Sequence, residues 1–344
     1  RCGNSLIGLG QKTEINTFSI SFEAISGNKS TGIPPENKKM RSKAREIIKK
    51  EIKERKIQGV PILITSFFTN RRTADICSSK FQEIIDLPEI DFDSIKQKEN
   101  MYNKLRKNEK YQQALDEANI WVSPYFWSFE SEVQGEIPRY TTIEQLRNNI
   151  QDPELKKLMV SIGKIAEDNQ FFHWYIEFPE VFSSERGGFD CILTNPPWET
   201  LQLKESEFFK GLNNDILSAP NQSERRKLIK QLQEKDLGLF MKYKNAWKAV
   251  KKLTHFLITS GLYLLTAKGT LNTYALFTDR CWRLLSKTGY FGIIIPTGII
   301  NNYYLRDFFK ELIQKRAILN LFDFINNKQL FNIHRDYRFC LLSI

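Results

Sequence analysis

The spacing of apolar residues changes along this chain of 344 residues. From about residue 11 to residue 167, apolar positions recur every three or four residues, which is the spacing of one face of an α-helix. The segment 38–56 shows this best, because its apolar residues share one helical face and the rest of the segment is mostly charged. These apolar residues are Met40, Ala44, Ile47, Ile48 and Ile52. We therefore expect residues 11–167 to form a mainly helical insertion.

From about Phe171 onward, short β-rich runs alternate with helical patterns. The runs that predict strands are Phe189 to Thr194, Tyr290 to Ile295, Ile318 to Phe324 and Tyr337 to Ile344. Helical spacing marks Leu271 to Leu285, Leu305 to Arg316 and a long insertion at 205–265. Such alternation predicts an α/β fold built on a layered sheet. We expect this α/β unit to span residues 168–344, with the helical insertion 205–265 inside it.

The chain is basic, with 51 Lys and Arg against 40 Asp and Glu and a formal net charge of +11. Its 41% of hydrophobic residues is typical of a folded globular protein and excludes an acidic, disordered tail. Two segments, 38–56 and 223–252, concentrate the positive charge. They supply four candidate contacts to DNA phosphates, which are Lys49, Lys50, Arg225 and Arg226. The alternative is that each segment is a solvated helix face.

The sequence favours neither a membrane span nor a metal site. The longest apolar runs, Phe256 to Thr266 and Tyr290 to Ile300, are shorter than the roughly 18 to 20 residues that span a bilayer. The five cysteines include no C-x-x-C pair, and the chain has only three histidines. This composition favours neither a disulfide framework nor a zinc cluster, so we expect a reducing, cytoplasmic location and no metal.

Four residues directly after the first predicted strand carry the candidate chemistry, and they are Asn195, Pro196, Pro197 and Trp198. Open α/β sheets bind their ligands at the carboxyl ends of their strands, which is where this motif falls. The prolines fix φ at about −65° and remove two N–H donors, so carbonyl oxygens can serve as acceptors without a competing donor. An Asn oxygen beside such a carbonyl suits an –NH₂ group, and Trp198 offers a face on which a base could stack.

Asn195-Pro196-Pro197-Trp198 resembles the motif of S-adenosylmethionine-dependent methyltransferases that act on the N6 of adenine in DNA. The approach to the motif, residues 172–182 and 187–190, resembles that of large type IIG restriction-modification and phage-defence (BREX- or DISARM-like) adenine methyltransferases. Further similar segments follow in the family's order at 207–209, 225–229, 272–277, 289–299, 322–324, 331 and 339–342. The resemblance covers about half the chain, from Phe171 to Ile344.

This resemblance implies a partial Rossmann-like methyltransferase fold with large helical insertions. It implies S-adenosylmethionine as cofactor and double-stranded DNA as partner, with other restriction or defence-system subunits as further candidate partners. It makes the four motif residues catalytic, places Asn4, Tyr274 and Phe277 on the cofactor side, and brings Phe331 to the extruded base.

Residues 1–8 resemble the segment that follows the third strand of that domain, so we expect residues 1–10 to end the N-terminal part of the methyltransferase core. The glycine-rich loop that holds the cofactor should then precede Arg1. We therefore expect the chain to be an excised piece of a longer polypeptide.

Two other interpretations stay open. The Asn-Pro-Pro-aromatic motif also occurs in enzymes that methylate RNA bases or the side-chain amide of protein glutamine. The chain could also be a non-catalytic fragment that only presents a basic face to DNA. Trp198, the long basic insertions and the approach to the motif favour DNA as the methylated substrate.

Overall fold

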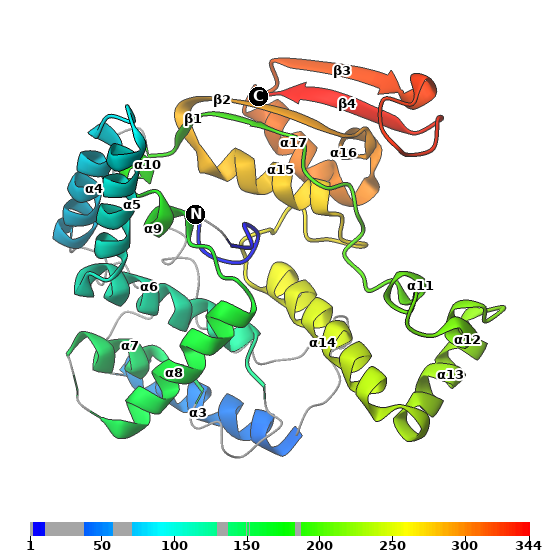
Figure 1. Ribbon diagram of the computed structural model, residues 1–344, viewed down its shortest axis with the longest axis horizontal. Helices are drawn as coiled ribbons and strands as arrows, with labels where there is room; N and C mark the ends of the chain where they lie inside the picture. Colours follow the sequence, from blue (N-terminus) through cyan, green and yellow to red (C-terminus); the bar gives the residue numbers. More distant parts are fainter. Residues whose placement is uncertain are drawn as a thin grey trace.

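The computed structural model describes residues 3–10, 38–57, 71–128, 137–148, 150, 152–182 and 187–344. Within these residues the fold is mixed α/β, as predicted, and consists mostly of helices with one four-stranded sheet. Figure 1 shows the sheet along one end of the molecule and the helical part at the other. No described helix is both long enough and apolar enough to cross a membrane.

The described residues between 38 and 182 form helices and the turns that connect them. The helices are α3 (Lys38–Ile57), α4 (Arg71–Asp86), α5 (Phe92–Arg106), α6 (Glu109–Val122), the 3₁₀ turn η3 (Ser123–Tyr125), α7 (Tyr140–Arg147), α8 (Pro153–Asp168), α9 (Trp174–Glu177) and α10 (Pro179–Phe182). In α3, Ala44 and Ile48 are buried, which confirms the predicted apolar face.

The alternative that the charged part of α3 is a solvated helix face does not hold for two of its charged residues. Glu51 and Arg55 are both buried, and Arg55 Nη2 donates to Glu144 Oε2 at 2.6 Å. Burial raises the pKa of the Glu51 carboxyl, although the backbone N–H of Thr141 donates to it and opposes that shift. Sequence spacing could not identify these partners, because they come from α7 and its first turn.

The sheet has the strand order β1-β2-β4-β3, with β1 parallel to β2 and with β4 antiparallel to both of its neighbours. The strands are β1 (Phe189–Thr194), β2 (Leu285–Pro296), β3 (Asn320–Ile325) and β4 (Arg338–Ser343). All four predicted strands are present, but β2 begins earlier than predicted. Phe189 pairs with Leu285, and a Cβ built on Gly188 would lie 2.5 Å from the Leu285 carbonyl carbon. The first residues of β2, 285–289, are mostly polar, and close pairing with β1 makes them part of the strand.

Among the described residues, helices cover only one face of the sheet. Three helices pack on the buried side chains of β2 and β4. They are α15 (Thr273–Leu284), which precedes β2, and α16 (Gly298–Asn301) and α17 (Arg306–Gln314), which follow it. The short 3₁₀ turns η4 (Tyr303–Leu305) and η5 (Asn326–Lys328) complete this part. The strand pairing places Leu193, Tyr290, Phe322 and Leu341 together on the opposite face, where Leu193 is 85% exposed. That face is therefore an apolar surface in this structure.

The predicted insertion between β1 and β2 forms a helical arm. It contains α11 (Glu205–Phe208), α12 (Asn214–Leu217), α13 (Gln222–Lys235) and α14 (Leu237–Thr259). The arm has a small core of its own around Phe209, Ile216, Ile229 and Leu232. In Figure 1, α13 and α14 meet where they are connected, diverge as the two limbs of a V, and extend away from the sheet.

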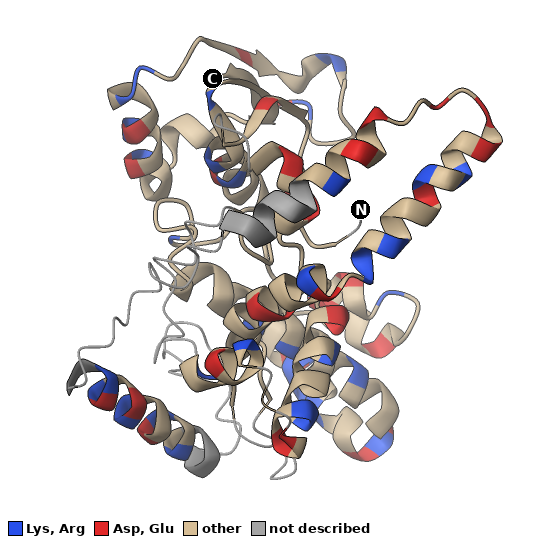
Figure 2. Ribbon diagram, turned by 90° about the vertical axis from the view of Figure 1, so that its left-hand side faces the viewer, with Lys and Arg blue, Asp and Glu red and all other residues tan. Residues whose placement is uncertain are grey.

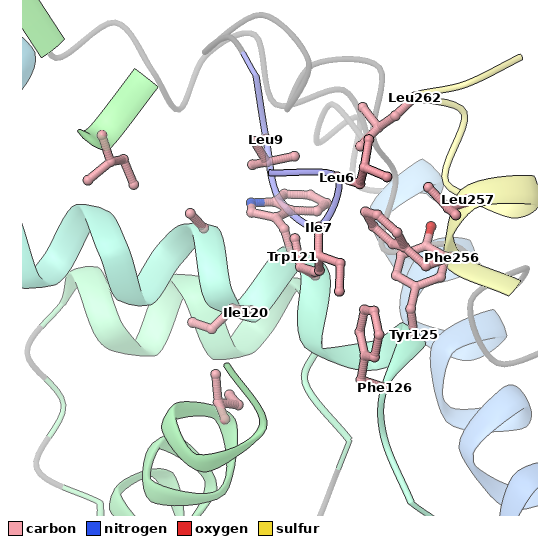
Figure 3. Packing of buried hydrophobic residues seen from close by; sticks show 14 of the residues in the cluster. Leu6, Ile7, Leu9, Ile120, Trp121, Tyr125, Phe126, Phe256, Leu257 and Leu262 are labelled. Carbon is pink, nitrogen blue, oxygen red and sulfur yellow. The ribbon is translucent and has the colours of Figure 1, made fainter. Parts of the chain in front are cut away.

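The segment 3–10 joins the helical part to the α/β part. Figure 3 shows Leu6, Ile7 and Leu9 packed between α6 and the end of α14. Arg280 of α15 donates to the Gly8 carbonyl at 3.2 Å. Gly8 has φ of 143°, and a Cβ there would lie 2.2 Å from the Phe172 carbonyl oxygen, so only glycine fits.

Candidate functional site

Three connections meet at one edge of the sheet. The parallel strands β1 and β2 both end there, and β3 runs the same way because two antiparallel pairings separate it from β2. The loop 195–200 follows β1, Thr297 follows β2, and the segment 326–337 follows β3. This edge is where open α/β sheets bind ligands, so the predicted motif stands at the predicted place.

The loop that carries the motif is anchored to the first turn of α15. The Thr273 hydroxyl lies 2.7 Å from the Pro197 carbonyl oxygen and 3.0 Å from the Glu199 carbonyl oxygen, and the Thr273 N–H donates to Glu199. Thr200 and Asn272 form an antiparallel bridge beside these bonds. Asn195 is exposed at the start of the loop, whereas Pro196 is buried. The second half of the loop is therefore fixed by α15, and the Asn195 amide remains accessible to solvent.

Trp198 belongs to an aromatic cluster. Its ring centroid lies 4.8 Å from that of Phe331, 6.1 Å from that of Phe339 and 6.2 Å from that of Tyr337. The indole N–H donates to the Ile294 carbonyl at 3.2 Å, one residue past the last β1–β2 pair. The structure therefore brings together Trp198 and Phe331, which the sequence analysis nominated separately.

A buried amide holds Phe331 in this cluster. Asn326 is fully buried, its Nδ2 donates to the carbonyls of Phe331 and Ile333, and its Oδ1 accepts from the Phe331 N–H. Nearby, the Thr297 hydroxyl donates to Asp323 at 2.5 Å, and Arg338 also pairs with Asp323. No role was predicted for Thr273, Asn326 or Asp323, although 272–277 and 322–324 are among the segments that resemble the family. Thr273 and Asp323 meet partners 76 and 26 positions away, whereas Asn326 bonds within its own loop, 5 to 8 positions away.

The residues nominated for the cofactor side lie in different surroundings. Tyr274 packs among the residues between α15 and the sheet, whereas Phe277 packs against the core of the helical part. Burial, together with the neighbouring Tyr337 and Cys340, raises the pKa of Tyr274 to about 12. Asn4 lies in the turn of segment 3–10, where its Oδ1 accepts from the Leu6 N–H at 3.2 Å. Tyr274 and Phe277 therefore pack on different clusters, although both lie on α15.

The nominated basic residues fall in two separate places. Lys49 and Lys50 are exposed on α3, which lies at the end of the molecule opposite the sheet in both views. Figure 2 shows acidic residues interleaved with the basic ones along this helix, and Lys50 pairs with Glu54 at 3.9 Å. Arg225 and Arg226 lie on α13, next to the segment that follows the motif loop.

His334 lies in the segment 326–337 at this edge, where its Nδ1 accepts from the Asp336 N–H at 3.3 Å. His173 is buried, with Nδ1 accepting from the Leu9 N–H and Nε2 within 3.1 Å of Asn119 Oδ1. Burial, with a smaller contribution from Arg280, lowers its pKa to about 3, so the imidazole is neutral. In the described part of the chain, no group of three or more His, Cys, Asp or Glu could hold a metal ion.

A protein family matches most of the chain, including the residues at this edge of the sheet. The model of a protein family described as Eco57I restriction-modification methylase matches residues 14–227 and 240–331. The matched ranges include the motif loop, α15 and Phe331. A search of the curated proteins finds no match.

Proposed function

Since the chain belongs to the Eco57I restriction-modification methylase family, we propose that it transfers a methyl group from S-adenosylmethionine to the N6 of adenine in DNA. Membership in this family makes the chain a methyltransferase of the restriction-modification type, and a DNA substrate follows from that. The choice of adenine N6 rests on the motif 195–198. We further propose that the sheet belongs to a Rossmann-like methyltransferase fold.

One observation carries the choice of N6. Asn195 is exposed at the carboxyl end of β1, in a loop whose Pro197 and Glu199 carbonyls already accept from Thr273. The Asn195 Oδ1 and the Pro196 carbonyl are then the two acceptors proposed for the two hydrogens of an –NH₂ group. Anchoring by Thr273 holds the loop in position before substrate arrives, which lowers the entropy cost of a productive geometry.

The chemistry requires the base to leave the duplex. Adenine N6 is a poor nucleophile, because its lone pair is delocalised into the ring, and it is out of reach inside the helix. Two acceptors that bind the N6 hydrogens draw this nitrogen towards tetrahedral geometry and localise the lone pair. Trp198 and Phe331 supply aromatic surface next to these acceptors, and S-adenosylmethionine supplies the methyl group. No base of matched pKa is required before methyl transfer.

Three of the described residues are proposed for the cofactor side. Asn4, Tyr274 and Phe277 lie in different surroundings, and the Asn4 Oδ1 already accepts a backbone N–H. We therefore propose that cofactor affinity needs the glycine-rich loop that the sequence analysis expects before Arg1. Calorimetric titration should detect weak binding of S-adenosylmethionine to residues 1–344 and stronger binding once upstream sequence is present. Tight binding to residues 1–344 would contradict this part of the proposal.

The decisive test is Asn195→Ala in the full-length polypeptide. Loss of one of two positioned acceptors should lower N6-methyladenine formation by at least about 100-fold, in line with the loss of one pre-organised polar group elsewhere. Mass spectrometry of digested DNA measures the product, and Asn245→Ala, an exposed asparagine on α14, is the matched control. Wild-type methylation by Asn195→Ala would overturn the assignment.

The same assay addresses the alternatives. RNA and glutamine-containing peptides are offered beside duplex DNA, and methylation of either in place of DNA would overturn the proposed substrate. We propose duplex DNA in the cytoplasm as the natural setting, with other subunits of a restriction or defence system as candidate partners.

A further inference from the structure

A cavity of about 490 Å³ opens directly after the motif loop. We infer that this cavity binds one nucleotide of the DNA strand. The phosphodiester would lie against Arg226 and Lys251, and the base would lie against Trp247. The inference rests on the proposed function, because it names a second contact with the same DNA. It adds a binding site that neither the motif nor the family match assigns.

The cavity lies between the arm and the sheet-edge loops. One wall is the segment 200–206, which continues from the motif, and a second wall is the segment 269–271 before α15. The backbone N–H of Leu201 donates to the Leu271 carbonyl at 2.9 Å, so the two segments are joined at the base of the cavity. Helices α13 and α14 provide the remaining walls. A ligand here would therefore lie next to the proposed catalytic loop.

The charged lining is mainly cationic. Lys204, Arg225, Arg226 and Lys251 contribute positive charge, and Glu205 is the acidic residue among the lining side chains. Glu205 accepts from the Tyr243 hydroxyl at 3.1 Å, and Lys204 pairs with Glu207 at 2.7 Å, so these groups already have partners. Arg225 donates through Nε to the Ile216 carbonyl at 3.2 Å, which holds it against the cavity wall. Such a site suits an anion, and a phosphodiester is the anion that DNA carries at every nucleotide.

One face of α14 lines the cavity, and it supplies both aromatic residues of the lining. Tyr243, Trp247, Val250, Lys251 and Thr254 recur at helical spacing and all face the cavity. The Lys251 ammonium lies 5.5 Å from the centroid of the Trp247 ring. A phosphate bound by Lys251 would bring its own sugar and base within reach of that indole. Cations that track the backbone beside an aromatic ring are the combination that binds unpaired nucleotides.

The size of the cavity also suits a single nucleotide. Ligand pockets commonly enclose about 300 to 1,000 Å³, so 490 Å³ accommodates one nucleotide and excludes a duplex from entering bodily. The cavity would therefore accept a nucleotide whose base is unstacked. An enzyme that extrudes its target base creates such unstacked nucleotides beside the site.

The test measures binding of fluorescein-labelled oligonucleotides by anisotropy, using the whole chain without cofactor. The probes are a single-stranded 12-mer, the same 12-mer with abasic sites, a duplex, and heparin as an anion without bases. The variants are Trp247→Ala, Trp247→Phe, Arg226→Gln and Lys251→Gln. Lys164→Gln on α8, an exposed lysine outside the cavity, is the matched control for the removed charge.

Trp247→Ala should weaken binding of the 12-mer by about 5- to 150-fold, the range for losing one stacked base, whereas Trp247→Phe should retain most affinity. The abasic 12-mer and heparin should bind wild type and Trp247→Ala alike. Arg226→Gln and Lys251→Gln should each flatten the slope of log K against log salt by about 0.7 on the single strand, and Lys164→Gln should leave it unchanged. Thermal unfolding followed by circular dichroism shows that each variant is folded.

Unchanged DNA binding in Trp247→Ala and Arg226→Gln would overturn this inference while leaving the proposed function to the Asn195→Ala assay. Equal loss of heparin and DNA binding in Trp247→Ala would also overturn it, because the indole would then act on structure and not on a base. If these variants weaken DNA binding as expected but the full-length polypeptide methylates no DNA, the cavity assignment stands and the proposed function fails.

Discussion

The Thr273 hydroxyl donates to the Pro197 carbonyl at 2.7 Å and so joins residues that are 76 positions apart in the chain. Thr273 is the first residue of α15, and Pro197 is the third residue of the motif loop. The same hydroxyl accepts from the Glu199 N–H at 3.0 Å. One short side chain therefore binds a carbonyl group and an N–H group of the loop backbone at the same time. The acceptors proposed for adenine, at Asn195 and Pro196, lie just before this fixed point.

We predict that Thr273→Val loosens the motif loop. The isosteric change removes the hydroxyl and its bonds to Pro197 and Glu199, each worth about 0.5 to 1.5 kcal/mol net. The free energy of unfolding in urea should fall by about 1 kcal/mol, because water can reach these exposed groups. Methylation by the full-length polypeptide should fall by about tenfold or more, since the loop is no longer held. Thr273→Ser keeps the hydroxyl and should retain both properties, and an equally active Val variant would refute the anchoring role.

We predict different outcomes for two substitutions of Trp198. Trp198→Ala should weaken binding of the extruded base by about 1 to 3 kcal/mol, because it removes the whole ring. Trp198→Phe loses the bond to the Ile294 carbonyl but keeps an aromatic face beside Phe331, and it should retain most activity. The measurement is the KM for DNA in a methylation assay, with urea unfolding as the check on stability. Equal loss in both variants would mean that Trp198 only packs the cluster.

The two basic segments should differ in their contribution to DNA binding. If α3 follows the phosphates, replacing Lys49, Lys50 and Lys53 with Gln should flatten the salt dependence on duplex DNA by nearly one unit for each phosphate that is no longer neutralised. Because α3 lies far from the sheet edge and carries interleaved acidic residues, we predict a smaller change here than for Arg225 and Arg226. Slopes of log K against log salt for both sets of variants, measured on one duplex, decide this. A larger effect of α3 would place the DNA path across the helical part.

Buried His173 should make stability depend on pH. Its pKa is about 3 in the folded protein and 6.5 ordinarily, because burial disfavours the charged imidazole. Between these values the unfolded chain binds the additional proton, so the free energy of unfolding should fall as pH falls from about 6.5 towards 3. The slope is at most about 1.4 kcal/mol per pH unit. Full stability from this group is present above pH 6.5.

The control for that prediction is His173→Gln, which removes the titration. Asp116 acts in the opposite direction, because burial and the neighbouring Glu117 raise its pKa to about 6. The difference between wild type and His173→Gln, measured by urea unfolding from about pH 4 to about pH 8, isolates the histidine. Parallel pH profiles for the two proteins would contradict the prediction.

Local patterns in the sequence determined where several elements lie. The strand β1 has the predicted bounds, Phe189–Thr194, because an apolar run stands between a glycine pair and an Asn-Pro-Pro turn that cannot continue a strand. The apolar stripe of α3 and the helices of the arm follow from helical spacing in the same way. The position of Asn195 at the carboxyl end of β1 also needs no information from outside its own segment.

Tertiary structure alone decided which distant groups meet. Phe331 lies against Trp198 because the buried Asn326 amide folds its loop, and Thr273 reaches Pro197 because α15 packs beneath the sheet. Only the folded arm places Arg226 and Trp247 around one cavity. The physical reason is that the spacing of apolar residues indicates only which residues of a segment face the core and which face solvent. Which buried group satisfies which partner depends on strand order and helix packing, and neither is encoded within a single segment.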